Sequence, residues 1–306
     1  MRKIKIGTRG SALAMVQTNQ AVDLLKRHHP NQSFEIVEIN TAGDLDASRP
    51  LVNFGAGAFT ARLEQELLVG NIDAAVHSAK DLPSSMNDDL KIAAVPSRGP
   101  VEDVWLSRHG ISLKDSKAGT IVGTSSPRRR AQLLNMRPDF KVQPIRGNIE
   151  TRLDKLESGQ YDAIVLAKAG LVRLGLRDNI NEILPPESFI PAPGQGALAF
   201  QIRAEDKEAE DMFSAIKNPQ SLRCLEIERG LMRKLNAGCS TPLGALAVFD
   251  DKRITLRAAV LDPDGRQRLY AENKISASQS DGLLINNVIE KLMAQGAGSI
   301  LAEYHG

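Results

Sequence analysis

The stretch Val122–Pro138, VGTSSPRRRAQLLNMRP, combines the end of an apolar strand with the start of a helix. We predict the strand at Thr120–Gly123 and the helix at Arg128–Asn135, with Ser125 and Ser126 able to cap it. In open α/β sheets, ligands bind beyond the carboxyl ends of the strands, where the free N–H groups of the following helices point. Consecutive arginines oppose the helix dipole, which favours anions at this end. The stretch therefore predicts α/β architecture, and its arginines indicate either an anion-binding edge or a solvated face.

The alternation of strand and helix continues on both sides of this stretch. The predicted strands are Lys3–Gly7, Phe34–Asn40, Asp73–His77, Lys91–Val95, Thr120–Gly123, Lys141–Ile145, Asp162–Ala167 and Ala197–Arg203. The predicted helices are Ser11–His28, Phe59–Val69, Arg128–Asn135 and Asn148–Glu157. Because the pattern restarts after Ser97–Pro100, we predict two α/β domains with parallel sheets and a cleft between them. The strand at 197–203 follows the second domain, so we expect the chain to return there to the first.

The last part of the chain has a different pattern. A helix is predicted at Gln220–Leu235, followed by strands at Leu243–Phe249, Ile254–Leu261 and Arg268–Lys274, and a final helix at Asp281–Gln295. Turn-type sequences join the strands, which indicates antiparallel hairpins in a small α+β domain. We therefore predict three domains: 1–98 with about 196–216, then 99–195, then 217–306.

Composition excludes several classes of function. The 306 residues are 42% hydrophobic and 25% charged, with a net charge of +2, which is typical of a soluble globular protein. A near-neutral chain with 4% aromatic residues lacks the basic field and stacking platforms of nucleic-acid binders. The N-terminus has no apolar signal region, and no apolar run is long enough to span a membrane. We expect a cytoplasmic protein with no nucleic-acid or membrane partner.

The chain has too few cysteines for a disulfide scaffold and too few suitably spaced histidines for a zinc site. The two cysteines cannot form a disulfide scaffold in a chain of this length. The five histidines have no zinc-binding spacing, so we expect no metal site.

Arginines follow several of the predicted strands. Arg146 ends one strand, Arg152 lies in the next helix, and Arg173 follows the strand at 162–167. Arg9, after the first strand, adds a donor from the other α/β domain. Guanidinium groups bind carboxylates or phosphates through two N–H groups at once. This recurrence favours an anion-binding cleft over a solvated face.

Two further residues are candidates for chemistry. Asp81, in AAVHSAKDLPSS, lies just past an apolar strand and beside Lys80. It is either a salt-bridge partner or a carboxylate for a cationic intermediate or a proton transfer, and the stretch leaves both open. Cys239, in LNAGCSTPLGA, lies in a Gly/Ser/Pro turn where a thiol is accessible and a reactive role is plausible. Cys224 is predicted to be buried in its helix.

Seven segments together resemble one family over essentially the whole chain. In order, GTRGSALA, VHSAKDLP, VGTSSPRRR, IRGNIETRL, YDAIVLAKAGLVRLG, PAPGQGAL and AGCSTPLGA resemble porphobilinogen deaminase, also called hydroxymethylbilane synthase. The resemblance implies two α/β domains of the periplasmic-binding-protein type (type II) and a small α+β third domain. It implies a transferase of tetrapyrrole (haem) biosynthesis that condenses four porphobilinogen molecules to hydroxymethylbilane and releases ammonia. It also implies a monomer.

The resemblance also implies roles for individual residues. Asp81 would be the catalytic aspartate, and Cys239 would hold a covalent dipyrromethane cofactor through a thioether. Cofactor and substrate carry acetate and propionate groups, which the arginines would bind. The positions that match the family's binding residues are Arg9, Ser11, Ser78, Lys80, Thr124, Ser125, Ser126, Arg128, Arg129, Arg146, Gly147, Arg152, Arg173 and Gln195.

The sequence departs from the family pattern in three places. The segment FGAGAFT has Gly57 where the family usually has a lysine, and TAGD has Ala42 in place of an arginine. GPVED, at 99–103, replaces the usual E-D-x-R-D. These changes remove basic groups from the predicted active-site loop and its surroundings. We expect an active enzyme in which these departures affect the turnover rate.

Two other classes of protein remain as alternatives at this stage. A two-lobed binding protein would hold an anionic ligand without reacting it, although the missing signal segment argues against a periplasmic receptor and such a protein needs no loop thiol. A nucleic-acid-binding protein could use Arg128–Arg130, although the chain as a whole is close to neutral.

Overall fold

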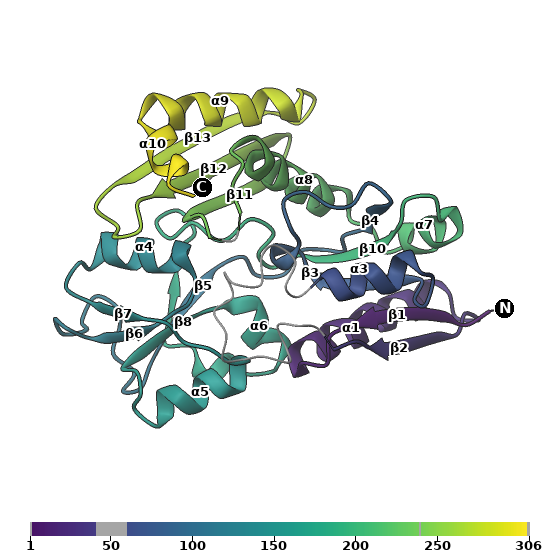
Figure 1. The fold of residues 1–306 in the computed structure, drawn as a ribbon, viewed down its shortest axis with the longest axis horizontal. Helices are drawn as coiled ribbons and strands as arrows, with labels where there is room; N and C mark the ends of the chain where they lie inside the picture. Colours follow the sequence, from purple (N-terminus) through teal and green to yellow (C-terminus); the bar gives the residue numbers. More distant parts are fainter. Residues whose placement is uncertain (1, 41–59, 239, 305–306) are drawn as a thin grey trace. The chain divides into compact units, whose positions relative to one another are not determined.

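A computed structural model of the chain describes residues 2–40, 60–238 and 240–304 (Figure 1). The chain forms two units: Met1–Gly99 with Gly196–Arg223, and Pro100–Gln195 with Cys224–Gly306. The chain therefore leaves the first unit near residue 99 and returns to it near 196.

The first unit contains a five-stranded sheet with the order β2-β1-β3-β10-β4. Its strands are β1 (Ile4–Thr8), β2 (Phe34–Glu38), β3 (Ala74–Ser78), β4 (Leu90–Ala94) and β10 (Leu198–Arg203). β1 is parallel to β2 and β3, whereas β10 is antiparallel to β3 and β4. The expectation of a parallel sheet is therefore wrong here, because the strand that returns from the other unit enters in the opposite direction.

Helices cover both faces of this sheet. α1 (Ala12–His28) and α7 (Lys207–Ser214) share one buried cluster with alternate residues of the strands. α3 (Ala61–Leu68) packs on the other face through Leu63 and Leu67. A 3-10 turn, η2 (Ala79–Asp81), directly follows β3. Because β1 and β3 are adjacent and parallel, the start of α1 and this turn lie at the same end of the sheet.

The second unit contains a sheet of the same design, with the order β7-β6-β8-β5-β9. Its strands are β5 (Asp103–Ser107), β6 (Ile121–Gly123), β7 (Lys141–Gln143), β8 (Ala163–Ala167) and β9 (Glu182–Leu184). β6 is parallel to β7 and β8, and β5 is antiparallel to β8 and β9. This sheet is also mixed rather than parallel. The helices that follow its strands are α4 (Pro127–Met136), α5 (Ile149–Glu157) and α6 (Lys168–Arg173), and the turn η3 (Arg177–Asn179) precedes β9.

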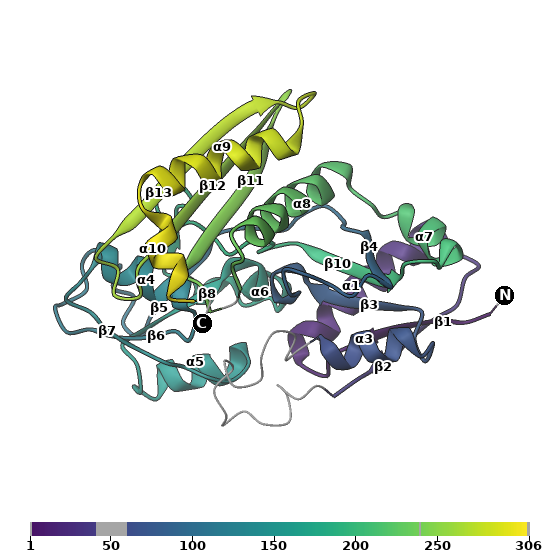
Figure 2. The ribbon, with the colours of Figure 1, turned by 45° about the horizontal axis from the view of Figure 1, so that its top comes forward.

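The last residues form a three-stranded antiparallel sheet with helices on one face (Figure 2). Its strands are β11 (Leu243–Asp250), β12 (Arg253–Leu261) and β13 (Arg268–Ser276), and its helices are α8 (Pro219–Lys234), α9 (Asp281–Ala294) and α10 (Ala297–Ala302). Inward residues of β12 such as Leu256 and Val260 are fully buried in a shared core. The predicted fold class, two α/β domains plus a small α+β domain, is confirmed.

The elements that sequence patterns did not reveal are mostly short. They are β5, β9, α6, α7 and α10. β9 has three residues and α6 has six, too few to show a period of two or 3.6. β5 is a buried run without alternation, since its two faces are buried in different hydrophobic clusters.

The turn between β12 and β13 packs directly on α4. Asn135 Nδ2 donates to the Gly265 carbonyl oxygen at 2.8 Å. Gly265 has a φ of +69°, and a Cβ there would lie 2.5 Å from Asn135 N and closer still to Ala131 O. Ala131, Ala259 and Leu261 are fully buried in the cluster beside this contact. The third sheet therefore fixes the helix that begins with the arginines.

Gly265→Ala tests this close contact. An alanine in the left-handed region loses about 1 kcal/mol, and overlap with the α4 backbone adds about 1–3 kcal/mol. Gly119→Ala is the matched control, because Gly119 has a φ of +80° with nothing within 4 Å of its Cβ position. Urea unfolding of both variants measures the difference. Equal losses of unfolding free energy would show that the contact with α4 contributes nothing.

Candidate functional site

A polar pocket lies in the first unit, at the end of the sheet where α1 begins. Its lining residues are Arg9, Ser11, Leu13, Ala14, Gln17, Thr60, Val76, His77, Ser78 and Asp81. Four residues predicted from the sequence, Arg9, Ser11, Ser78 and Asp81, therefore line one pocket. β1 and β3 end side by side and bring these segments together.

The α1 side of the pocket suits an anion. Ser11 caps the helix, since its Oγ accepts from Ala14 N at 3.3 Å. No acidic residue lies in the first turn of α1, and Arg9 precedes the cap. The partial positive charge of the helix N-terminus and the guanidinium together favour a carboxylate. Gln17 Nε2 donates to Ser78 Oγ at 3.0 Å, which fixes the serine against the helix.

Asp81 is held by the turn that follows β3. Ala79 N donates to Ala197 O at 3.0 Å, which attaches the turn to the beginning of β10. The Asp81 side chain is half-buried at the pocket wall, and the adjacent Lys80 is half-buried but does not line the pocket. Asp81 thus places a carboxylate on a fixed turn in the same pocket as Arg9.

A buried polar chain lies behind the pocket. His77 Nε2 and Gln201 Oε1 are 2.9 Å apart, and Gln201 Nε2 donates to Glu64 Oε1 at 2.9 Å. Because the Gln201 Nε2 group donates to Glu64, the oxygen of the same amide faces the imidazole and accepts a hydrogen bond from His77 Nε2. Burial is the main reason that the pKa of His77 is lowered to about 4. The positive charge of Arg9 contributes to the decrease, whereas the hydrogen bond with Gln201 opposes it. His77 is therefore a neutral imidazole at physiological pH.

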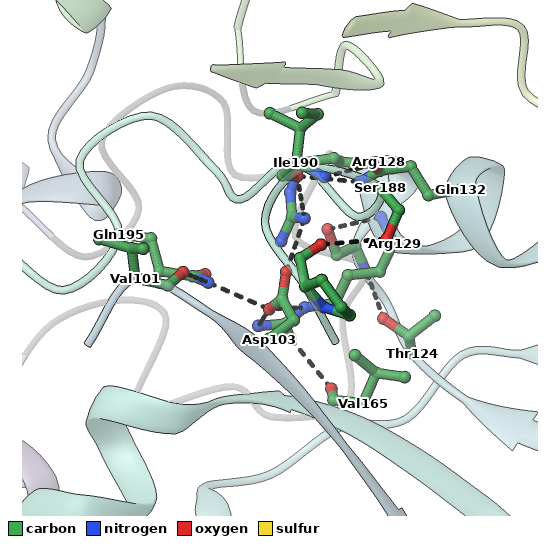
Figure 3. A network of polar contacts seen from close by, with 12 residues as sticks. Val101, Asp103, Thr124, Arg128, Arg129, Gln132, Val165, Ser188, Ile190 and Gln195 are labelled. Atoms are coloured by element: carbon green, nitrogen blue, oxygen red, sulfur yellow. Dashed lines mark hydrogen bonds and ion pairs between the residues drawn. The ribbon is translucent and has the colours of Figure 1, made fainter. Parts of the chain in front are cut away.

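In the second unit, two arginines of the opening stretch converge on one buried carboxylate (Figure 3). Arg128 Nη1 donates to Asp103 Oδ2 at 2.7 Å, and Arg129 Nε donates to Asp103 Oδ1 at 2.9 Å. Arg128 is 3% exposed, Arg129 7% and Asp103 0%. These two arginines are therefore not a solvated face. Among the ion pairs of the described residues, this cluster has one carboxylate for two guanidinium groups, an excess of one positive charge.

Backbone groups and a glutamine complete this cluster. Arg128 Nη1 also donates to Ile190 O at 2.7 Å, and Arg129 Nη1 donates to Val165 O at 3.1 Å. Gln195 Nε2 donates to Val101 O at 2.7 Å and to Asp103 Oδ1 at 3.2 Å (Figure 3). Gln195 is therefore part of the Asp103 cluster.

The three hydroxyl residues before α4 have different tasks. Ser126 caps the helix, with its Oγ 3.4 Å from Arg129 N. Thr124 Oγ1 accepts from Ser126 N at 3.2 Å, and Ser125 Oγ donates to Ile145 O at 2.7 Å. This segment is thus held between its own helix and the end of the neighbouring strand.

The remaining predicted residues lie at the ends of β7 and β8. Arg152 Nε donates to Gly147 O at 2.8 Å, which joins the start of α5 to the preceding turn. Arg146 is half-buried, and its carbonyl accepts from Lys155 Nζ at 3.1 Å. Burial lowers the pKa of Arg173, at the end of α6. Their roles as carboxylate-binding residues stay predictions.

Some predicted residues lie outside the described part of the chain. They are Cys239, Ala42 and Gly57. The departure at 99–103 is described: Glu102 accepts from Lys168 Nζ at 2.9 Å. Although burial raises the pKa of Glu102, backbone N–H groups and Lys168 bring it below its usual range. The Glu102 charge is thus paired with Lys168.

Sequence reasoning missed three polar residues of the pocket: Gln17, Thr60 and His77. Gln17 lies on the same face of α1 as Ala14, three residues earlier, and this spacing could have revealed it. His77 and Thr60 carry no such signal, since their places follow from the packing of α3 on β3.

Two features are absent from the part of the chain that the structure describes. No helix there is long and apolar enough to cross a membrane. No group of His, Cys, Asp or Glu side chains in residues 2–40, 60–238 and 240–304 is arranged to hold a metal ion.

Asp103→Asn tests the buried ion cluster. The amide keeps the shape of the side chain but leaves two buried guanidinium groups without a counter-charge, so we expect a loss of about 3–5 kcal/mol of unfolding free energy. Glu102→Gln is the matched control, because its partly exposed pair with Lys168 contributes only about 0–1 kcal/mol. Urea unfolding at neutral pH measures both. A loss no larger than that of the control would contradict the assigned role of Asp103.

Comparison with known proteins identifies the family of the chain. The family model "Porphobilinogen deaminase, dipyromethane cofactor binding domain" matches residues 4–211, and "Porphobilinogen deaminase, C-terminal domain" matches 222–291. The porphobilinogen deaminase of Thermus thermophilus is 44% identical over 99% of both chains. That of Brevibacillus brevis is 44% identical over 99% of this chain and 98% of the relative.

Solved structures similar to the chain include binding domains. The periplasmic VFT2 domain of BvgS from Bordetella pertussis aligns with a TM-score of 0.44 and 15% identity, covering 74% of this chain and 92% of that one. Substrate-binding domain 2 of GlnP from Lactococcus lactis aligns with a TM-score of 0.43 and 13% identity, covering 77% and 91%. The family models and the curated relatives carry the assignment: the chain belongs to the porphobilinogen deaminase family.

Proposed function

We propose that the chain condenses four porphobilinogen molecules head to tail into hydroxymethylbilane, with release of ammonia, and that Asp81 is its catalytic carboxylate. The chain is a transferase of the porphobilinogen deaminase family. The observation that carries the role of Asp81 is the pocket that it shares with Arg9, Ser11 and Ser78. Carboxylate, guanidinium and helix N-terminus meet there within one rigid unit.

Asp81 can serve the reaction in three ways. Its carboxylate accepts hydrogen bonds from pyrrole N–H groups and so orients the ring. It stabilises the positive charge that develops as ammonia leaves the aminomethyl carbon. It also accepts a proton after the new carbon–carbon bond has formed. The fixed turn after β3 holds the carboxylate in one place for these steps.

The chain uses the dipyrromethane cofactor of its family. When bound, this group supplies the pyrrole carbon to which the first substrate is joined. The residues of the second unit fit its acidic side chains, because the Asp103 cluster has one guanidinium more than it has carboxylates. A carboxylate beside Arg128 or Arg129 would balance that charge. We propose Cys239 as the attachment point, because Cys224 is buried in α8.

If the arginines at the start of α4 bind carboxylates, the free energy gained exceeds the cost of placing cations at a helix N-terminus. A charge-assisted hydrogen bond contributes about 1.5–3 kcal/mol. A cation at a helix N-terminus loses only about 0.3–1 kcal/mol. We propose the same carboxylate-binding role for Arg146, Arg152 and Arg173.

Three further properties complete the proposal. We propose three domains, at 1–98 with about 196–216, at 99–195 and at 217–306. We also propose a cytoplasmic monomer that acts in haem biosynthesis. Gel filtration with light scattering tests the oligomeric state, and a dimer would contradict it.

Asp81→Ala tests the catalytic role. We expect porphobilinogen to bind, while ammonia release falls by about 10²–10⁴-fold because proton transfer and charge stabilisation are lost. Asp88→Ala is the matched control, since Asp88 is an exposed acid a few residues further along the same loop. Ammonia and hydroxymethylbilane are measured for wild type and both variants. Wild-type rates in Asp81→Ala would remove Asp81 from the mechanism, and a wild type that binds dicarboxylates without ammonia release would favour a binding protein.

Cys239→Ser tests the attachment of the cofactor. The serine oxygen is a poorer nucleophile than a thiolate, so we expect a folded protein whose intact mass lacks the two pyrrole units. Cys224→Ser is the matched control, and it should keep the added mass. Mass spectrometry of the two purified variants and the wild type distinguishes these cases. Added mass on Cys239→Ser would place the attachment elsewhere.

A further inference from the structure

Thr60 is a buried pocket residue whose hydroxyl has no assigned task. It precedes α3 at the N-cap position and lines the same pocket as Asp81. Thr60 is 1% exposed, and its Oγ1 has no hydrogen-bond partner among the described residues. A buried hydroxyl without a partner loses the hydrogen bonds that water would give it, so valine would be better tolerated at such a position.

The missing bond is not explained by the capping of α3. The helix begins normally, since Glu64 N donates to Thr60 O at 2.9 Å, but the hydroxyl accepts no backbone N–H. At five other helices the N-cap side chain does accept one. These N-caps are Ser11, Ser126, Asn148, Asp206 and Ser280. Thr60 is thus an N-cap residue whose hydroxyl does not cap its own helix.

The first turn of α3 is held firmly in place. Leu63 packs with no exposed surface against the sheet, and Glu64 accepts from Gln201, which in turn bonds His77. His77 also lines the pocket, so the same buried chain connects α3 to the pocket wall. A hydroxyl on such a fixed turn loses little entropy when it binds a ligand.

We propose that Thr60 Oγ1 donates a hydrogen bond to a carboxylate of a pyrrole bound in this pocket. This inference rests on the proposed function, which supplies a ligand with acetate and propionate groups. The pocket favours an anion, because it contains Arg9 and the N-terminus of α1. The neutral His77 adds no competing charge. A carboxylate there would give the hydroxyl the partner that the protein does not provide.

Thr60→Val and Thr60→Ser test the proposal in the holoenzyme, with cofactor loading checked by intact mass. Valine keeps the shape without the hydroxyl, so the melting temperature should be unchanged or higher, while KM for porphobilinogen rises roughly tenfold. The kcat should stay within about twofold, because the bond persists from ground state to transition state. Serine keeps the hydroxyl and should restore the KM.

Thr18→Val is the matched control for a hydroxyl with a structural role. Thr18 is fully buried in α1, and its Oγ1 donates to Thr8 Oγ1 at 2.7 Å. This variant should lower the melting temperature and leave KM unchanged, the opposite of the pattern expected for Thr60→Val.

Two results would overturn the proposal. A Thr60→Val enzyme that melts lower with unchanged KM would show that the hydroxyl has a protein partner. Unchanged melting and unchanged KM would show that it binds nothing. Both results need a wild type that releases ammonia, so they are distinct from a failure of the proposed function, in which the wild type itself would be inactive.

Discussion

The buried carboxylate of Asp103 determines how the second unit can present positive charge. It accepts from Arg128 and Arg129, and Gln195 donates to its Oδ1 atom. Removing such charges from water is costly unless each has a partner with good geometry. The cluster therefore fixes both guanidinium groups at the start of α4 in one arrangement. Because the turn at Gly265 packs on the same helix, the third sheet depends on that arrangement too.

The two sheets share a strand order but differ in the charges that follow equivalent strands. The middle strand β3 is followed by the acid Asp81, whereas its counterpart β8 is followed by Lys168, and arginines come after both β1 and β6. Porphobilinogen has both kinds of charge, an aminomethyl group and two carboxylates. A pocket with a carboxylate beside Arg9 can bind one molecule at both ends, whereas the excess positive charge at α4 suits carboxylates alone. This difference in charge follows from which residues come directly after each strand.

Local sequence patterns predicted most strands and helices, because each has its own period and its own caps. Ser11 and Ser126 were expected as caps and act as caps. The prediction of parallel sheets was wrong, because β5 and β10 pair with strands that are distant in the sequence. No local sequence pattern indicates such pairing. The Asp103 cluster escaped prediction for the same reason, as its members are 25 and 26 residues apart. Gathering Arg9 and Asp81 into one pocket likewise required the pairing of β1 with β3.

The change of charge at residue 102 shows how a departure from the family pattern can be accommodated. Glu102 directly precedes Asp103, so an unpaired carboxylate there would compete for Arg128 and Arg129. Lys168, the first residue after β8, instead pairs with Glu102 at 2.9 Å and also donates its backbone N–H to the Glu102 carbonyl at 3.0 Å. Since β5 and β8 are paired, these two positions always meet. The Glu102 charge is thereby paired, and Asp103 remains the acidic partner of Arg128 and Arg129.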